Sequence, residues 1–482
     1  MSNCPVEDRT AINTARCHRA SVRIWRRVTS RSTVPNESTS STNSSGEFSG
    51  CAAVGVTIAI CLPLGMAKNT LTTDDARDQH GNPTGLLEQA NDVFDDMVAM
   101  RRDLHEWPEI SNHLPRTRDR VLQSLEGLPL DITLHETTSG IAAMLTGDKP
   151  GPTVLLRADM DALPMPEDTD VAFKSRVENV MHACGHDTHT SMLMGAAKIL
   201  SARKADIAGR VLFMFQPGEE GYNGASEMLN EGLLDVGTDS PVTGAFAIHA
   251  ASNIPGGFLG LKGGTMMASS DNFMITIKGK GGHGSAPHFT LDPVPVACEI
   301  VQALQTLVTR RIDVFDPGVI TVTQIHTGTT SNVIPETAMI NGTMRAVSER
   351  TRTLIHDGIR RVAEGIVAAH GMDADIDLQY GYDVTVNDHD FAGFAADVAT
   401  AVSGDRNVRI MDNPVMGAED FSYVLNRVQG SMMFLGLMPE GMDIMKAAPN
   451  HSNRAIYAED YMRRGTAVYS AMALRHLGVS LS

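Results

Sequence analysis

Three short apolar runs constrain the fold of this 482-residue chain most strongly. They cover residues 153–156, 211–215 and 244–250, and none alternates strictly between apolar and polar side chains. Helical periodicity marks residues 86–104 and 189–200 on either side of the first run. Strands that are apolar on both faces and separated by helices indicate a parallel sheet that helices cover on both sides. The sequence therefore predicts an α/β fold with a mostly parallel sheet.

Each apolar run leads into side chains that can bind a ligand or move a proton. Asp159 and Asp161 follow the first run, Glu219 and Glu220 follow the second, and His249 lies at the end of the third. In open α/β sheets, ligands bind outside the carboxyl ends of the parallel strands. Three strand ends with such side chains therefore predict one shared site.

A different pattern interrupts this fold. Strands and helices are expected in the order β-α-β-β-α-β, at residues 272–280, 295–312, 318–328, 338–347, 348–371 and 373–380. This order is typical of a ferredoxin-like α+β domain. Ser348 is expected to cap the second helix, and Gly371 to end it. We therefore expect a catalytic domain in two parts, residues 86–268 and 385–482, with a smaller domain inserted at residues 269–384.

The first 85 residues do not fit either pattern and are expected to be a leader outside the working fold. Eleven of the seventeen residues in 29–45 are Ser or Thr, a composition that cannot build a core. An uncharged run at 48–67 resembles a signal-peptide core that ends near Ala67. Glycine and proline interrupt the run, so no stable membrane span is expected. A cytoplasmic protein that begins at Met66 is the prediction, and export through this signal peptide is the alternative.

Charge and cysteine content exclude several classes of protein. The chain has 40 Lys and Arg against 57 Asp and Glu, a net charge of −17, so nucleic acid is not an expected partner. Only Cys184 and Cys298 lie beyond residue 61, which excludes a disulfide scaffold. A G-x-G-x-x-G pattern at 279–284 is followed by Pro287 and not by a helix, so dinucleotide binding is rejected.

The densest group of metal-binding residue types lies at residues 181–189, in the sequence MHACGHDTH. Cys184 and His186 place two ligands of zinc and neighbouring transition metals close together at the start of a helix. The alternative is a structural cysteine beside surface histidines. The number of such residues in one short segment favours a metal site.

Two further segments supply candidate ligands that are ambiguous when taken alone. In QPGEEG at 216–221, one of the paired carboxylates can bind a metal while the other takes a proton, although both could be solvated in a turn. His249 by itself is typical of a core histidine, and His451 in the segment PNHSN is typical of a surface loop. Their significance depends on whether they meet.

Seven segments together resemble the amidohydrolase branch of the dinuclear zinc-peptidase family. They are RADMDALP, MHACGHDTHTSMLMGAA, FQPGEEGYNGASEML, GKGGHGSAPH, NVIPETAMINGTMR, GAEDFSY and HSN. That branch includes hippurate hydrolases, N-acyl-amino-acid amidohydrolases and hydrolases of auxin conjugates. The resemblance covers roughly residues 90–475. It implies that the inserted ferredoxin-like domain is a dimerisation domain and that the protein is a homodimer.

The resemblance also implies roles for individual residues. The ligands of two divalent metal ions (zinc, or manganese, cobalt or nickel) would be Cys184, His186, Glu220, His249 and His451. Glu219 would be the general base, and Asp161 would support the metal site. His283 would stabilise the tetrahedral intermediate in the neighbouring subunit's site. Asn332 and Arg345 match positions that contact the carboxylate end of the substrate.

The implied reaction is metal-dependent hydrolysis of the linear amide bond of an N-acyl amino acid, which gives a carboxylic acid and a free amino acid. A guanidinium such as that of Arg345 binds a carboxylate through two parallel hydrogen bonds, which favours substrates with a free carboxylate. A dipeptidase or aminopeptidase on the same scaffold is the nearest alternative. A protein that binds metal or acyl amino acids without catalysis is a more distant one.

Overall fold

The computed structural model describes residues 85–481. The predicted leader, with the start at Met66 and the alternative signal peptide, therefore lies outside the described residues except for Gly85. Within the described part of the chain, no helix is both long enough and apolar enough to cross a membrane.

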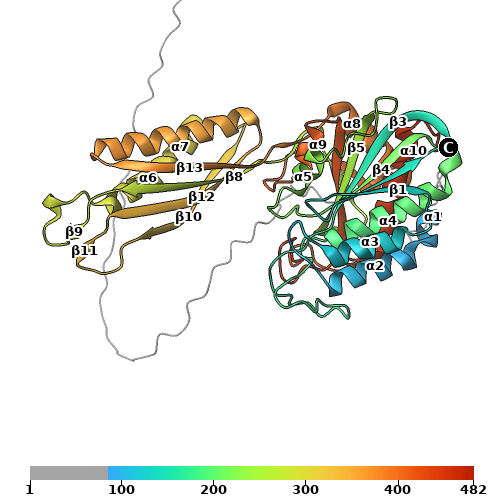
Figure 1. The fold of residues 1–482 in the computed structure, drawn as a ribbon, viewed down its shortest axis with the longest axis horizontal. Helices are drawn as coiled ribbons and strands as arrows, with labels where there is room; N and C mark the ends of the chain where they lie inside the picture. Colours follow the sequence, from blue (N-terminus) through green and yellow to red (C-terminus); the bar gives the residue numbers. More distant parts are fainter. Residues whose placement is uncertain (1–84, 482) are drawn as a thin grey trace, which may run out of the picture. The chain divides into compact units, whose positions relative to one another are not determined.

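An eight-stranded mixed sheet forms the larger α/β layer (Figure 1), in the order β1-β2-β4-β3-β5-β16-β6-β15. Its four central strands are parallel: β4 (Ala208–Gln216), β3 (Lys149–Asp159), β5 (Val242–Pro255) and β16 (Gly430–Met438). The outer strands are β1 (Leu130–Leu134), β2 (Ile141–Thr146), β6 (Leu259–Leu261) and β15 (Val408–Ile410). The predicted α/β class with a mostly parallel central sheet is confirmed.

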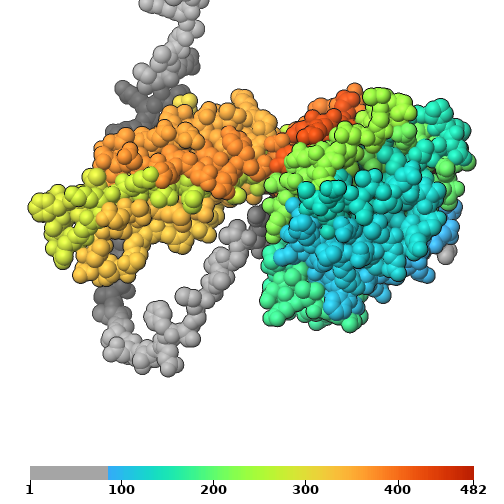
Figure 2. Space-filling model, viewed as in Figure 1, coloured from blue at the N-terminus to red at the C-terminus, as the bar shows by residue number. Residues whose placement is uncertain are grey.

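Helices pack on both faces of this sheet, because its central strands are apolar on both faces. Val154 and Leu156 of β3 belong to one core cluster, and Leu155 between them belongs to another. The first cluster includes side chains of α1 (Leu86–Asp92), α2 (Phe94–Glu106), α3 (Pro115–Leu125), α4 (His186–Ala202), α8 (His389–Ser403) and α10 (Met462–His476). The second includes side chains of α5 (Gly224–Asn230) and α9 (Ser422–Leu425), which are far apart in sequence but in contact (Figure 2).

The helix expected over residues 86–104 is divided in two. Val93 separates α1 from α2, and its backbone N–H bonds to Asn91 O instead of continuing the helix. Apolar periodicity continues across this break, since Leu86 and Met97 both enter the same core. Periodicity alone therefore could not reveal the interruption.

A four-stranded antiparallel sheet forms a second layer, in the order β10-β12-β8-β13. Its elements along the chain are β8 (Ser270–Lys278), α6 (Pro293–Arg311), β10 (Gly318–Thr327), β12 (Thr337–Ala346), α7 (Glu349–Ala369) and β13 (Asp373–Tyr382). Their order is the expected β-α-β-β-α-β, and both helices pack into one core with the sheet. Ser348 caps α7 by accepting from Thr351 N, and Gly371 follows the helix with a φ of +67°.

Shorter elements complete the fold. Two strand pairs are β7 (Gly264–Met267) with β14 (Thr385–Asn387), and β9 (Gly282–His283) with β11 (Val333–Ile334). The 3-10 helices are η2 (Lys204–Asp206), η3 (Pro287–Phe289), η4 (Asp405–Asn407) and η5 (Glu459–Tyr461).

A buried carboxylate joins β8 to α7 and to the end of β13. Asp271 Oδ2 accepts from Arg352 Nε and His356 Nε2, both at 2.8 Å. Its Oδ1 accepts from Arg352 Nη2 at 2.7 Å and from Gly381 N at 2.9 Å. Burial opposes ionisation, but the hydrogen bonds from Arg352 and His356 lower the pKa of Asp271 to about 2.

We predict that Asp271→Asn lowers the free energy of unfolding by about 3 kcal/mol at pH 7, because it leaves the buried guanidinium of Arg352 without its buried carboxylate and with only the more exposed Glu349 and Asp383 as partners. The folded-state pKa lies below the ordinary value of about 3.9. The ionised carboxylate therefore stabilises the fold above about pH 4, and this stabilisation is lost as the pH falls towards 2. Urea unfolding of both proteins from pH 7 to pH 2 measures the difference.

The matched control is Asp375→Asn, which removes the exposed partner of Lys278 on the same sheet. Exposed ion pairs stabilise by about 0–1 kcal/mol, so this change is expected to have a small effect. Equal effects of the two substitutions at pH 7, or a difference that does not shrink at low pH, would contradict the prediction.

Candidate metal centre

Cys184 and His186 flank a sharp backbone turn at the start of α4. Gly185 between them has a φ of +85°, and a Cβ there would lie 2.8 Å from the ring of Tyr457. Glycine is therefore required both by the left-handed backbone and by the close approach of the ring. The turn directs the cysteine and the first helical residue towards the carboxyl ends of the central strands.

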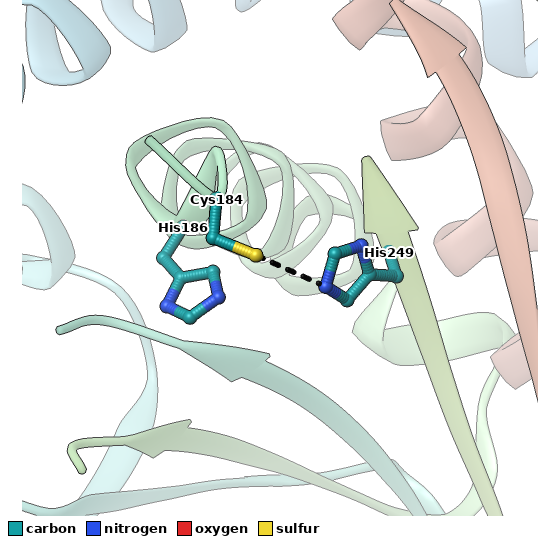
Figure 3. A group of neighbouring side chains, drawn as sticks. All are labelled: Cys184, His186 and His249. Carbon is teal, nitrogen blue, oxygen red and sulfur yellow. Dashed lines mark hydrogen bonds between the residues drawn. The ribbon is translucent and has the colours of Figure 1, made fainter. Parts of the chain in front are cut away.

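Two backbone carbonyls fix which nitrogen of each histidine faces the site. His186 Nδ1 donates to Asp161 O at 2.9 Å, and His249 Nδ1 donates to Ala250 O at 2.8 Å. A carbonyl oxygen only accepts, so each Nδ1 carries a hydrogen, and the neutral ring presents the lone pair of Nε2 to the site. Figure 3 shows His249 on β5 opposite Cys184, with His249 Nε2 at 3.5 Å from Cys184 Sγ.

Glu220 and His451 complete the group. His451 Nε2 lies 3.2 Å from Glu220 Oε1, and His186 Nε2 lies 3.9 Å from the same oxygen. Cys184 forms one cluster of ligand atoms with His186 and His249, and a second with Glu220 and His451, each within 4.8 Å. The structure thus brings together all five side chains that the sequence singled out as ligands, and Cys184 is common to both clusters.

The donor atoms fit divalent cations. His186 Nε2 and Glu220 Oε1 are buried and have no hydrogen-bond partner among the described residues. Buried polar atoms in native proteins are nearly always bonded, so these two atoms are suited to bind an ion. Thiolate, imidazole and carboxylate are the donors that zinc and neighbouring transition metals prefer.

The electrostatics of the group agree with a site for cations. Burial opposes ionisation of Cys184, but His249, His451 and His186 hold the pKa of its thiol well below the ordinary value. Burial and the Cys184 thiolate raise the pKa of Glu220 to about 7. The same thiolate raises the pKa of His451 to about 11. The Cys184 thiolate is thus the anion that shifts the pKa of both neighbouring donors.

The loop that carries the two glutamates is held from both sides. Asp161 accepts from Glu219 N and Glu220 N, each at 3.0 Å. Tyr382, at the end of β13, accepts from Gly221 N at 2.7 Å and donates to Glu219 O. Asp161 therefore supports the loop itself, and the loop is also bonded to the four-stranded layer.

Glu219 lies beside the ligand cluster and is buried. Its carboxylate is close to those of Glu419 and Asp420 on one side, and to His186 and Glu220 on the other. Burial, then Glu419 and Glu220, raise its pKa well above the ordinary value. A carboxylate with a raised pKa is suited to accept a proton near neutral pH.

A buried arginine, which the sequence analysis did not single out, organises the acids behind the site. Arg157 donates to Asp159 Oδ2 and Glu419 Oε1 at 2.8 Å each, and to Asp420 Oδ1 at 3.1 Å. Asp159 also bonds to His189 Nδ1 at 2.5 Å. Asp159 therefore has two side-chain partners, and its carboxylate also lies with His186 and His189 in a group that could hold an ion. The sequence did contain a signal for this ion pair. The segment RADMDALP holds the arginine and GAEDFSY holds two of its acidic partners, but nothing in the sequence indicates that the two segments meet.

The remaining predicted site residues lie apart from the ligand cluster. His283 on β9 is exposed, and its Nδ1 accepts from Ser285 N at 3.1 Å. Asn332 is exposed beside it, and its backbone carbonyl accepts from Gly284 N at 2.8 Å. Arg345 on β12 is half-buried and donates to Thr343 Oγ1 at 2.7 Å. Within the described chain, the structure brings His283 and Asn332 together but joins none of the three to the ligands.

Comparison with known proteins identifies clear relatives. The sequence model of peptidase family M20/M25/M40 matches residues 155–475. Thermostable carboxypeptidase 1 of Saccharolobus solfataricus is 36% identical over 81% of this chain and 98% of its own. The N-acyl-L-amino acid amidohydrolase of Geobacillus stearothermophilus is 40% identical over 62% of this chain and 79% of its own. The solved structure of the Bacillus subtilis YXEP protein, a dinuclear metal binding peptidase, has a TM-score of 0.69 and 31% identity, covering 81% of this chain and all of that one.

We predict that Zn²⁺ stabilises the chelator-treated protein. A ligand that binds only the folded state at 100 times its dissociation constant adds about 2.7 kcal/mol of stability. Differential scanning calorimetry before and after addition of the metal is expected to show an upward shift of the melting temperature.

The paired variants are His451→Ala, which removes an exposed predicted ligand, and His370→Ala, which removes an exposed histidine bonded to Glu299. The first is expected to lose much of the shift and the second to keep it. An unshifted wild-type protein, or equal shifts in the two variants, would show that the cluster is not a metal site.

Proposed function

Because the chain belongs to peptidase family M20/M25/M40, we propose that it is a dinuclear metal-dependent amidohydrolase that releases an amino acid from N-acyl amino acids. That it is a hydrolase acting on amide bonds follows from the family and from relatives named for such reactions. The N-acyl amino acid as substrate and the roles of individual residues form the proposal.

The proposal rests on the convergence of five donor side chains beside the carboxylate of Glu219, which can act as a base. Cys184, His186, Glu220, His249 and His451 would hold two divalent metal ions, zinc or one of manganese, cobalt and nickel. When bound, such ions supply Lewis-acid chemistry that polarises a carbonyl group and makes a water molecule more acidic.

The protein's own residues would move the proton. Glu219 would accept a proton from the attacking water on its carboxylate and return it to the leaving nitrogen. Glu220 cannot perform this task if its lone pairs face a cation. Asp161 accepts from both backbone N–H groups, which fixes the loop that carries the two glutamates.

Arg345 and Asn332 would bind the carboxylate end of the substrate. A guanidinium binds a carboxylate through two parallel hydrogen bonds, which favours substrates that end in a free carboxylate. An N-acyl amino acid has this end, and so does the carboxyl-terminal residue of a peptide. Relatives named carboxypeptidase and N-acyl-L-amino acid amidohydrolase are consistent with this shared requirement.

His283 would donate to the oxyanion of the tetrahedral intermediate from the neighbouring copy of a homodimer. Its exposure on β9 supports a role towards a second chain and not towards the cluster of its own chain. A donor aimed at the developing oxyanion stabilises the transition state more than the substrate.

We predict that Glu219→Gln lowers the hydrolysis rate by about 10²–10⁴-fold, because the amide cannot accept the proton. The variant is expected to keep two metal ions per chain, whereas Glu220→Gln is expected to lose metal as well as activity. Elemental analysis of the dialysed proteins, together with rates on an N-acyl amino acid, separates the two. Retained turnover in Glu219→Gln would refute the role of this residue.

A substrate panel tests the proposed substrate class. N-acetyl, N-benzoyl and indole-acetyl amino acids are expected to be cleaved faster than dipeptides with a free amino group, which a dipeptidase or aminopeptidase would prefer. Arg345→Ala is expected to lower kcat/KM about 10–100-fold on acyl amino acids, because a charged hydrogen bond stabilises by about 1.5–3 kcal/mol. The same substitution is expected to change kcat/KM little on substrates whose carboxylate is amidated. A uniform loss on both kinds of substrate would contradict carboxylate binding by Arg345.

A further inference from the structure

His451, like Glu220, stands in neither a helix nor a strand. It follows β16 in a segment without regular secondary structure between Met438 and Glu459. Its own backbone has a φ of +66°, a left-handed conformation that is unfavourable for a non-glycine residue. Contacts outside regular structure must therefore hold this ligand in place.

The side chain of Asn450, next to His451, bonds to two other ligand-bearing segments. Asn450 Nδ2 donates to Ala250 O at 2.8 Å and to Cys184 O at 3.2 Å. Asn450 Oδ1 accepts from Ser252 N at 3.0 Å. One amide thus connects the backbone of Cys184, the strand that carries His249, and the loop that carries His451.

Only a primary amide of this length satisfies these three partners. Two of them are carbonyl oxygens, which need a donor, and the third is a backbone N–H, which needs an acceptor. An aspartate would place an oxygen against the two carbonyls, and an alanine would supply neither function. A separate bond from His451 N to Ala183 O, at 2.8 Å, completes the attachment to the segment before Cys184.

We propose that Asn450 is a positioning residue for the metal centre, which sets Cys184, His249 and His451 in register by bonding, from the loop that carries His451, to the backbone of the other two segments. The proposal rests on the metal centre of the proposed function. Residues that orient metal ligands without touching the metal typically change its affinity about 10–100-fold when substituted. Asn450 therefore determines how tightly the cluster holds its ions.

The test is Zn²⁺ affinity of the full-length protein, measured by competition with a chelating dye. Asn450→Ala is expected to bind Zn²⁺ about 10–100-fold more weakly than the wild type. The control is Asn453→Ala in the same loop, whose backbone carbonyl accepts from Asp168 N at 2.7 Å. Among the described residues its side chain has no hydrogen-bond partner, so this variant is expected to keep wild-type affinity.

A purely structural role would lower the melting temperature of the metal-free protein and leave the affinity of the folded protein unchanged. Wild-type affinity in folded Asn450→Ala therefore overturns the proposal. If Asn450→Ala does not fold, Asn450→Gln decides, because it keeps the amide but displaces it by one methylene. Weaker binding by this variant supports the proposal, and unchanged binding overturns it. If the wild-type protein itself binds no Zn²⁺, the proposed function fails and not this inference alone.

Discussion

Around the candidate site, buried carboxylates outnumber buried guanidinium groups, and this is the constraint on which the structure depends. Arg157 supplies one positive charge to Asp159, Glu419 and Asp420, while Glu219 and the ligand cluster lie on the other side of them. Burying an ion without a partner costs several kcal/mol, so such a site needs cations or protons. A pair of divalent ions would supply the positive charge at the point where the donors converge. The buried carboxylates and the positions of the donor atoms therefore both favour a site for two cations.

The donors are held by hydrogen bonds to backbone more than by bonds among themselves. Asp161 uses its carboxylate for two backbone N–H groups and its carbonyl for the ring of His186. Ala250 receives the Nδ1 hydrogen of His249 and a hydrogen of Asn450 on the same carbonyl. Because backbone positions are set by the central strands, the arrangement is preorganised by the sheet. Tyr382, at the end of β13, also bonds the loop of Glu219 to the four-stranded layer.

Much of this could be predicted from the sequence, because the predictive features are local. The apolar runs predicted three of the four central strands but not β16, and the order of elements predicted the second layer. The five ligands were predicted from their residue types and the family resemblance, and the structure brings them together. Arg157 was missed because an arginine at the end of an apolar strand gives no sign of its partners more than 260 residues later. Asn450 was missed because most of its hydrogen bonds go to backbone atoms, which every residue possesses.

Anomalous X-ray diffraction from crystals grown with Zn²⁺ tests the central claim most directly. The account predicts two anomalous peaks per chain, separated by about 3.5–4 Å as in other two-metal sites. Both peaks are expected to contact Cys184, with the other four donors divided between them. A single peak, or peaks elsewhere on the chain, would contradict the account.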